Sequence, residues 1–246
     1  MSRALAQQLP NLSPVERIRA IRSENFGEIV FTTSFGLEDQ VLTHLIAESG
    51  ADIAFATLDT GRLFSEIHAL WAETETRYGI RIVAYAPRHE SIEDYVAENG
   101  INGFYASIEA RKACCHIRKV EPLGRALKGA AGWITGLRSD QSPARGDTPF
   151  AEENAQYGLM KFNPLLDFSR ESALAFARAH DVPINPLHSQ GFLSIGCAPC
   201  TRAVRAGEPE RAGRWWWEDE PKKECGLHVG PDGKFVRPAI SKEAFT

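Results

Sequence analysis

The sequence predicts an α/β fold, in which a parallel sheet carries helices on both faces and a flexible tail follows. Short β-branched and aromatic segments alternate with helical segments through the first third of the chain, and no internal repeat or low-complexity run occurs. Strands that alternate with helices are joined by right-handed crossovers and lie parallel, which buries both faces of the sheet. We expect one main domain over 1–217 and a mobile C-terminal tail over 218–246.

A leading helix is expected over 14–24. Ser13 can cap it, Pro14 suits its first position, and Glu16 completes a capping box. This helix should pack outside the sheet. The alternating strands and helices then follow, beginning with a strand, over 28–34, 37–50, 51–61, 64–79 and 80–87. Farther along, 132–137 is predicted to be a buried strand and 169–181 a helix.

The charge balance excludes bulk attraction to nucleic acid. Lys and Arg total 28 against 32 Asp and Glu, which leaves a net charge of −4. Any anionic ligand therefore needs local cations. No run of 18 apolar residues occurs, and Glu16, Arg17 and Arg19 interrupt the place where a secretory signal needs an apolar stretch. We therefore expect a soluble, cytoplasmic protein with no nucleic-acid or membrane partner.

Four of the five cysteines form two close pairs, Cys114 with Cys115 and Cys197 with Cys200. Five cysteines are too few for a disulfide scaffold, whereas four thiolates suit tetrahedral zinc or an iron-sulfur cluster. Adjacent thiolates are accommodated more easily by two irons of a cubane than by one zinc ion. The pattern favours iron-sulfur, with zinc and unligated core cysteines as the alternatives.

The fifth cysteine, Cys225, stands alone in a segment that is charged and rich in glycine and proline. A thiol becomes a nucleophile only as a thiolate, and Lys222, Lys223 and His228 are cations that can raise the thiolate fraction. Cys225 is therefore a candidate nucleophile on a mobile arm. An incidental exposed thiol is the alternative interpretation.

Two glycine-containing turns follow neighbouring predicted strands. The first holds Ser34, Phe35 and Gly36, and the second holds Asp59 and Thr60. Each turn alone is compatible with a merely tight connection. Together, at the carboxyl ends of adjacent parallel strands, they predict one crevice for a nucleotide phosphate at a helix N-terminus.

Positive charge is grouped in spite of the acidic total. The groups are Arg111, Lys112, Arg118 and Lys119 around the first cysteine pair, Arg138 and Arg145 in "TGLRSDQSPAR", and Arg211 and Arg214 in "PERAGRWWW". Taken singly these residues are typical of a solvated surface, but together they can clamp phosphate or sulfate oxygens. The three tryptophans 215–217 are expected mainly in the core, with stacking on a base as the alternative.

Seven motifs carry a resemblance to a known family. They are "TTSFGLEDQVL", "TLDTGRLF", "CCHIRKVEPL", "WITGLRSDQSPAR", "GFLSIGCAPCTR", "RAGRWWWE" and "KKECGLH". In this order they resemble the motifs of assimilatory sulfonucleotide reductases, adenylylsulfate (APS) reductase branch, over about residues 28 to 229. The resemblance implies a fold related to the ATP pyrophosphatases and one 4Fe-4S cluster held by the two cysteine pairs.

The resemblance also implies a reaction. Cys225 would attack the sulfur of adenosine 5'-phosphosulfate, with His228 beside it, releasing AMP and leaving an S-sulfocysteine. Thioredoxin would then free sulfite, as a step of sulfate assimilation toward cysteine biosynthesis. The substrate contacts that it implies are Ser34, Phe35, Gly36, Asp59, Thr60, Lys119, Gly136, Arg138, Arg211 and Arg214. Assembly into homo-oligomers is a further expectation from the family.

Three rival functions stay open on the sequence. The nearest is reduction of 3'-phosphoadenosine 5'-phosphosulfate (PAPS) by the same mechanism. The second is a zinc-binding, ATP-dependent thiolation enzyme of the pyrophosphatase group. The third is a non-enzymatic metal-binding module, which leaves the nucleotide loops and Cys225 without a role.

Overall fold

A computed structural model describes residues 3–24, 27–141 and 145–218 of the chain. The predicted nucleophile Cys225 and its neighbour His228 lie outside the described residues. So does the predicted tail, apart from its first residue, Glu218. Glu218 is buried and pairs with Arg111, so the packed body reaches at least one residue past the predicted boundary.

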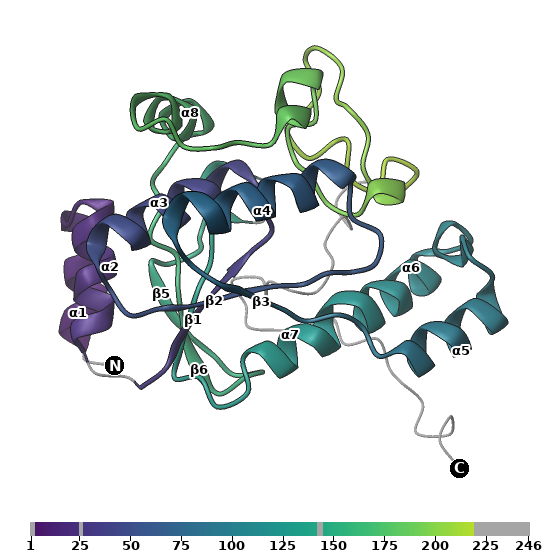
Figure 1. The fold of residues 1–246 in the computed structure, drawn as a ribbon, viewed down its shortest axis with the longest axis horizontal. Coiled ribbons are helices and arrows are strands. Elements are labelled where there is room, and N and C mark those ends of the chain that lie inside the picture. Colours follow the sequence, from purple (N-terminus) through teal and green to yellow (C-terminus); the bar gives the residue numbers. More distant parts are fainter. Residues whose placement is uncertain (1–2, 25–26, 142–144, 219–246) are drawn as a thin grey trace.

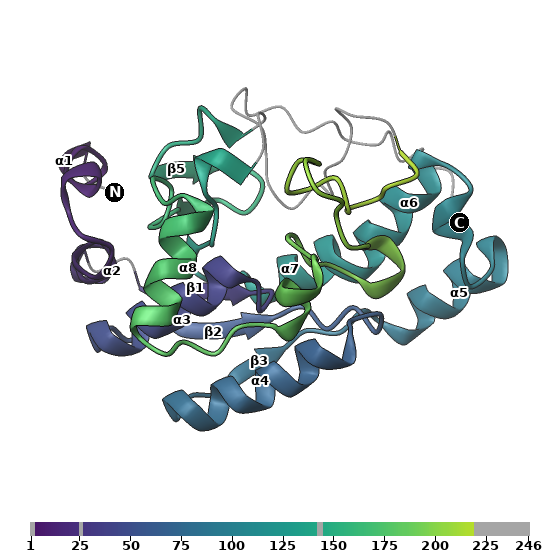
Figure 2. The ribbon, with the colours of Figure 1, turned by 90° about the horizontal axis from the view of Figure 1, so that it is seen from above.

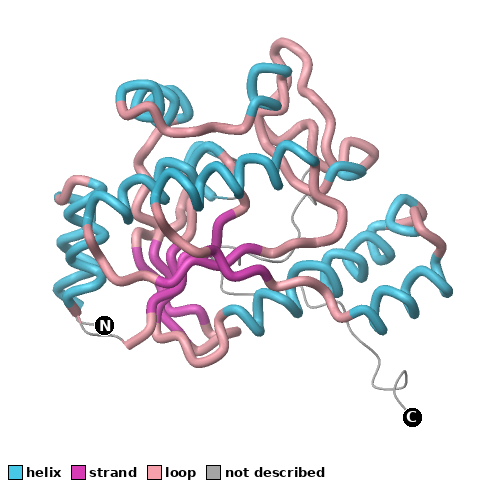
Figure 3. The backbone as a smooth tube through the Cα atoms, viewed as in Figure 1, coloured by secondary structure: helices cyan, strands magenta, loops and turns pink. Residues whose placement is uncertain are grey.

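The described part of the chain is built on a six-stranded sheet, with strand order β3-β2-β1-β4-β6-β5. The strands are β1 (Ile29–Thr33), β2 (Ala54–Thr57), β3 (Ile82–Ala84), β4 (Gly132–Ile134), β5 (Ala151–Asn154) and β6 (Leu159–Phe162). Five of them run parallel, as predicted, while the edge strand β5 pairs antiparallel with β6. The sheet lies at the centre of the fold, with helices on either side (Figure 3).

The described α-helices are α1 (Arg3–Gln8), α2 (Pro14–Ser23), α3 (Leu37–Ser49), α4 (Ser65–Tyr78), α5 (His89–Asn99), α6 (Ile108–Cys115), α7 (Glu121–Ala126) and α8 (Arg170–Ala179). A π-helical segment, His116–Val120, joins α6 to α7. Short 3₁₀ helices cover Leu9–Asn11, Gly103–Tyr105, Ser139–Gln141, Pro186–Gln190 and Ala198–Cys200. None of the described helices has the length and apolar content that crossing a lipid bilayer requires.

Alternate residues of the strands feed two separate cores, because successive side chains in a strand point to opposite faces. Phe31 of β1 and Ile134 of β4 pack with α3, α4 and α8 in one cluster. Val30 and Trp133, one position away, pack with α7 in the other. Figure 1 shows α3, α4 and α8 on one side of the sheet and α7 on the other, so the prediction of helices on both faces is confirmed.

The leading helix α2 packs against α3, away from the sheet, as predicted. Its capping box is present: the Ser13 backbone N–H donates to Glu16 Oε2 at 2.8 Å. The buried Arg17 fixes this helix to the rest of the fold, because its guanidinium pairs with Asp167 at 2.7 Å.

The chain changes direction in the sheet at β1. Strands β2 and β3 extend the sheet on one side of β1, and after β3 the chain returns through α5, α6 and α7 to place β4 on the other side. Such a switch point opens a crevice at the carboxyl ends of the two strands, where α/β proteins bind ligands. The returning helices α5 and α6 lie side by side, away from the sheet (Figures 1 and 2).

Candidate active site

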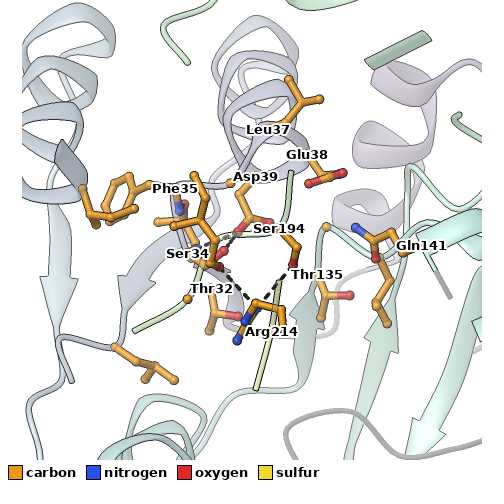
Figure 4. Close-up of a pocket in the computed structure, with 18 of the residues that line it drawn as sticks. Thr32, Ser34, Phe35, Leu37, Glu38, Asp39, Thr135, Gln141, Ser194 and Arg214 are labelled. Atoms are coloured by element: carbon orange, nitrogen blue, oxygen red, sulfur yellow. Dashed lines mark hydrogen bonds between the residues drawn. The ribbon is translucent and has the colours of Figure 1, made fainter. Parts of the chain in front are cut away.

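A cavity of about 200 Å³ occupies the switch point. Its walls come from the ends of β1, β2 and β4 and from the segment 188–214. The strand register brings Thr33 beside Thr57, and the Thr57 hydroxyl donates to the Thr33 carbonyl at 2.8 Å. Figure 4 shows Ser34, Thr135 and Arg214 pointing toward this common space.

The loop between β1 and α3 is held in an unusual conformation. Phe35 has φ of 58°, a left-handed value that is uncommon for a bulky residue, and its buried ring stacks on Trp71. Gly36 then caps α3, whose N-terminus faces the cavity. This confirms the predicted turn into a helix N-terminus, the arrangement that suits a phosphate. The loop's left-handed residue is Phe35 rather than its glycine.

Asp39, in the first turn of α3, ties this loop together. Its Oδ2 accepts hydrogen bonds from the Ser34 backbone N–H at 2.6 Å and from the Ser34 hydroxyl at 2.7 Å. Burial raises the pKa of Asp39 to about 6, although the two hydrogen bonds from Ser34 act in the opposite direction. The cavity therefore contains a carboxyl group that can be neutral in mildly acidic solution.

Gly136, after β4, is required by the close approach of Asp39. A Cβ atom at position 136 would lie 2.2 Å from Asp39 Oδ1. Gly136→Ala is expected to displace Asp39 and the Ser34 loop, destabilising the fold by about 1–3 kcal/mol and weakening nucleotide binding by at least tenfold. Calorimetric titration with AMP and thermal unfolding measure the two effects.

Gly124→Ala is the matched control, because the nearest atom to a Cβ there is Tyr157 Cε1 at 3.8 Å and the position is helical. Unchanged AMP affinity in Gly136→Ala would show that the close approach does not shape the site.

Among the described residues, four cationic side chains line the cavity: Lys119, Arg145, Arg211 and Arg214. Arg214 is buried, and its Nη1 donates to Ser194 Oγ at 3.3 Å and to the Ile195 carbonyl at 3.4 Å. Its guanidinium also lies 4.8 Å from the centre of the Trp215 ring. Cations that are withdrawn from water attract an anionic ligand more strongly than exposed ones.

Arg138 is placed differently from these four residues. Its fully buried guanidinium binds Glu38 at 2.7 Å, Glu210 at 2.9 Å and also Asp140, and it is not among the residues that line the cavity. Burial lowers the pKa of Arg138, but the charges of Glu38 and Glu210 outweigh burial and leave this pKa above its ordinary value. Its predicted substrate contact stays a prediction.

Arg145, from the same motif as Arg138, is the cavity-lining arginine that the site prediction left out. The signal available in the sequence was its membership of the basic motif, which does not distinguish the two arginines.

Asp59, like Arg138, lies outside the cavity lining: its Oδ1 accepts from the Gly61 N–H at 3.0 Å, and its other oxygen lies 3.7 Å from His68.

The four predicted ligand cysteines are gathered in one place. Cys114 and Cys115 end α6, while Cys197 precedes a short 3₁₀ helix and Cys200 ends it. All four are buried around one small cavity. No three of the described His, Cys, Asp and Glu side chains converge as one metal ion requires. Four clustered thiols are a donor set that suits an iron-sulfur cluster.

A buried donor belongs to a residue that lines the cysteine cavity. Trp215 lines this cavity, and its Nε1 is buried without a hydrogen-bond partner among the described residues. A buried N–H normally finds an acceptor. A group bearing sulfur acceptors would supply one, so the residues present fit an anionic iron-sulfur group.

The cysteine cavity and the switch-point cavity share Lys119 and Cys197. Thr60 joins them as well, with its hydroxyl oxygen 3.3 Å from Cys197 Sγ. Burial raises the pKa of Cys197, but the charge of Lys119, the Thr60 hydrogen bond and nearby arginines outweigh it, so this pKa lies below its ordinary value. For Cys200, burial and the Cys197 charge raise the pKa to about 12. Lys119 is therefore placed between the two sites.

Most of the predicted substrate contacts lie at one site. The cavity lining includes Ser34, Phe35, Gly36, Thr60, Lys119, Gly136, Arg211 and Arg214. Of the three tryptophans, Trp215 is buried as predicted, whereas Trp216 is 40% exposed.

Comparisons with known proteins show the family of this chain. The family model described as "Phosphoadenosine phosphosulfate reductase domain" matches residues 28–203. An "Adenosine 5'-phosphosulfate reductase" of Sinorhizobium fredii (strain USDA 257) is 52% identical over 243 residues, which cover 99% of this chain and 96% of the relative. The protein of the same name from Allochromatium vinosum is 52% identical over 218 residues, covering 87% and 85%.

Solved structures show the same fold. The phosphoadenylyl-sulfate (PAPS) reductase of Candida auris, in a phosphate complex, aligns with a TM-score of 0.70 at 26% identity over 83% of this chain and 98% of its own. Yeast FAD synthetase, at 18% identity and a TM-score of 0.53, shares the fold alone over 82% of this chain and 69% of its own. The predicted relation to the ATP pyrophosphatase fold is confirmed, and the chain belongs to the phosphoadenosine phosphosulfate reductase family.

Proposed function

We propose that this protein reduces adenosine 5'-phosphosulfate to sulfite and AMP, with Cys225 as the nucleophile and thioredoxin as the reductant, in assimilatory sulfate reduction. The observation that carries the proposal is the cationic cavity at the switch point, which shares Lys119 with the four-cysteine cavity. A nucleotide pocket beside four clustered thiols matches the activity named for relatives that are 52% identical over most of the chain.

The cavity suits an adenine nucleotide that ends in two anionic groups. Leu58, Leu123 and Trp133 provide an apolar wall, while Lys119, Arg145, Arg211 and Arg214 provide the positive charge. Sulfate in this substrate is already activated by its phosphate leaving group. The protein therefore needs mainly to position the sulfur and to offset negative charge that builds up on the leaving phosphate.

The reaction balances as two exchanges at sulfur. The Cys225 thiolate attacks the sulfate sulfur, a sulfur–sulfur bond forms, and the sulfur–oxygen bond to AMP breaks. One thiolate of thioredoxin then attacks Cys225 Sγ, sulfite leaves, and the second thioredoxin thiol closes a disulfide while Cys225 is released. The two electrons come from the thioredoxin dithiol. Lys222, Lys223 and His228, near Cys225 in the sequence, favour the thiolate that starts the reaction.

We propose that Cys114, Cys115, Cys197 and Cys200 hold one 4Fe-4S cluster. Their common buried cavity and the unpartnered Nε1 of Trp215, which lines it, support this assignment. When bound, the cluster supplies charge and structural order next to the nucleotide, since thiol exchange alone carries the two electrons. Visible absorption near 400 nm and iron analysis test the assignment against zinc.

PAPS is the competing substrate, because a PAPS reductase is among the structural neighbours. The relatives at 52% identity carry the name of the APS enzyme, which favours APS. Competing the two nucleotides in one assay decides between them. A preference for PAPS would change the substrate but not the nucleophile.

The most direct test of the proposed function is mass spectrometry after mixing the protein with labelled APS in the absence of thioredoxin. An adduct of one sulfonate group on Cys225, released as sulfite when reduced thioredoxin is added, is the expected result. An unmodified Cys225 together with cleavage of ATP would instead support the ATP-dependent rival. The expected homo-oligomeric assembly is measured on the same sample by light scattering.

Lys119→Ala is expected to slow sulfonation of Cys225 by about 10- to 100-fold, because one buried cation next to the reacting anion is lost. Iron content should stay unchanged, since Lys119 is not one of the four residues proposed to hold the cluster. Lys112→Ala is the control, because Lys112 lies in the preceding helix α6 and lines neither cavity. Equal sulfonation rates in the two variants would remove Lys119 from the site.

A further inference from the structure

We infer that Arg111 and Glu218 form an anchor that fixes the start of the C-terminal segment beside the four-cysteine cavity and thereby positions Cys225 for attack. Both are positioning residues, because neither lines the switch-point cavity. The inference rests on the proposed function, since it assigns them a task in the reaction of Cys225.

The anchor is a buried, two-pronged ion pair. Arg111 Nε donates to Glu218 Oε1 at 2.8 Å and Nη2 donates to Oε2 at 2.6 Å. The side chain of Arg111 is 0% exposed and that of Glu218 is 3% exposed. A bidentate pair fixes the direction of a carboxylate as well as its distance, and breaking a buried pair leaves an uncompensated charge.

Arg111 also connects this pair to a predicted cluster ligand. Arg111 and Cys115 are four residues apart in α6, so they lie on the same face of the helix. Arg111 lines the four-cysteine cavity and also pairs with Glu218, the first residue of the predicted tail.

The chain between the nucleotide cavity and the anchor is tightly held. Trp215 has φ of 41°, a strained value for a tryptophan, and its backbone N–H donates to the Cys200 carbonyl at 3.1 Å. The Glu218 N–H then donates to the Trp215 carbonyl at 2.9 Å. The Arg111 guanidinium lies 4.6 Å from the Trp215 ring centre. The anchor and the strained turn thus form one packed unit.

Covalent geometry gives the anchor its importance. Cys225 is the seventh residue after Glu218, so it lies within roughly 25 Å of the anchored residue. Arg214, which lines the cavity, is four residues before Glu218 and lies within roughly 14 Å of it. The nucleophile therefore acts on a short tether, and a short tether gives a high effective concentration at the substrate.

Glu218→Gln tests the anchor, because it keeps the shape of the side chain and removes its charge. Glu208→Gln is the matched control: Glu208 pairs with Arg202 at 2.8 Å in the same segment, but both side chains are partly exposed. The iron-loaded proteins are mixed with excess APS without thioredoxin, and the single-turnover rate of Cys225 sulfonation is followed by intact mass. AMP affinity and iron content are measured in parallel.

Glu218→Gln is expected to slow sulfonation about tenfold, because reaction rates depend steeply on the placement of the nucleophile. AMP affinity and iron content should equal those of Glu208→Gln. Without the anchor, the tether starts at Trp215, whose N–H binds the Cys200 carbonyl, and by tether length alone the rate falls by only roughly twofold. A fall of less than threefold relative to the control overturns the inference.

A double-mutant cycle shows whether the two residues act as a unit. Arg111→Lys keeps the charge but loses the two-pronged geometry, and it should slow sulfonation to a similar degree. The double variant Arg111→Lys/Glu218→Gln should be no slower than the slower single variant. Additive slowing contradicts a common anchor.

Trypsin gives a readout that does not depend on activity. Cleavage after Lys222 and Lys223 should be at least threefold faster in Glu218→Gln than in Glu208→Gln, and equal cleavage contradicts the anchor. If wild-type Cys225 takes up no sulfonate, the proposed function fails, while cleavage still decides whether the anchor exists.

If Glu218→Gln binds less iron, Glu218→Asp replaces it as the test variant. Sulfonation at a rate between those of wild type and Glu218→Gln then supports the inference, and a wild-type rate overturns it.

Discussion

Replacement of Cys225 by serine is expected to lower sulfite release from APS by on the order of 10⁴-fold or more, as loss of an enzyme nucleophile does elsewhere. A serine hydroxyl stays protonated at neutral pH. An oxygen–sulfonate ester, even if formed, offers thioredoxin no sulfur to attack, so thiol exchange is blocked at both steps.

AMP binding and iron content are the internal controls for Cys225→Ser. The described cavity and the four clustered cysteines lie before residue 218, so both measurements should match wild type. Sulfite release is measured in the steady state with reduced thioredoxin. A rate above one tenth of wild type would show that Cys225 does not carry the reaction.

Arg214→Ala is expected to have the second-largest effect, a fall in kcat/KM of about 10²- to 10³-fold. Arg214 is buried at the cavity wall, where its charge is weakly screened. The Arg214 guanidinium fits against Gly196 because glycine has no side chain: a Cβ atom at position 196 would lie 2.3 Å from Arg214 Nη2. The fold thus brings this one cation close to the backbone of the cysteine-bearing loop.

Arg205→Ala is the matched control for Arg214→Ala, because Arg205 is an exposed arginine of the same segment and does not line the cavity. Thermal unfolding of both variants separates lost stability from lost substrate binding. If kcat/KM of Arg214→Ala stays within threefold of the control, Arg214 does not act on the substrate.

Local patterns predicted the elements that alternate early in the chain. The apolar residues of β1, α3, β2, α4 and β3 have the spacing of a strand or a helix within each segment alone. The structure confirms these five elements. The hairpin of β5 and β6 was not predicted. Its edge strand, Ala151–Asn154, contains two glutamates, and it becomes a strand only because β6 offers a partner. The helices α5 to α7 and their π-helical segment were likewise not predicted.

Two arginines of one motif show why the site could not be completed from the sequence. Arg138 and Arg145 are equivalent as sequence features. Glu38 and Glu210 surround Arg138, and they are 100 and 72 residues away from it along the chain. Charges that distant meet only after folding, so sequence proximity cannot tell which arginine is neutralised and which one lines the cavity.

The sequence by itself determined the chemistry of this protein: four paired thiols, a lone cysteine among cations, and two turns at the ends of neighbouring strands. Those features are local, and their residue types limit what they can bind. Only the tertiary structure decided that Lys119 lies between the two cavities, that Arg138 is enclosed by carboxylates, and that Arg111 holds Glu218. The physical reason is that burial and charge pairing depend on long-range contacts, which the packing of the sheet and its helices creates.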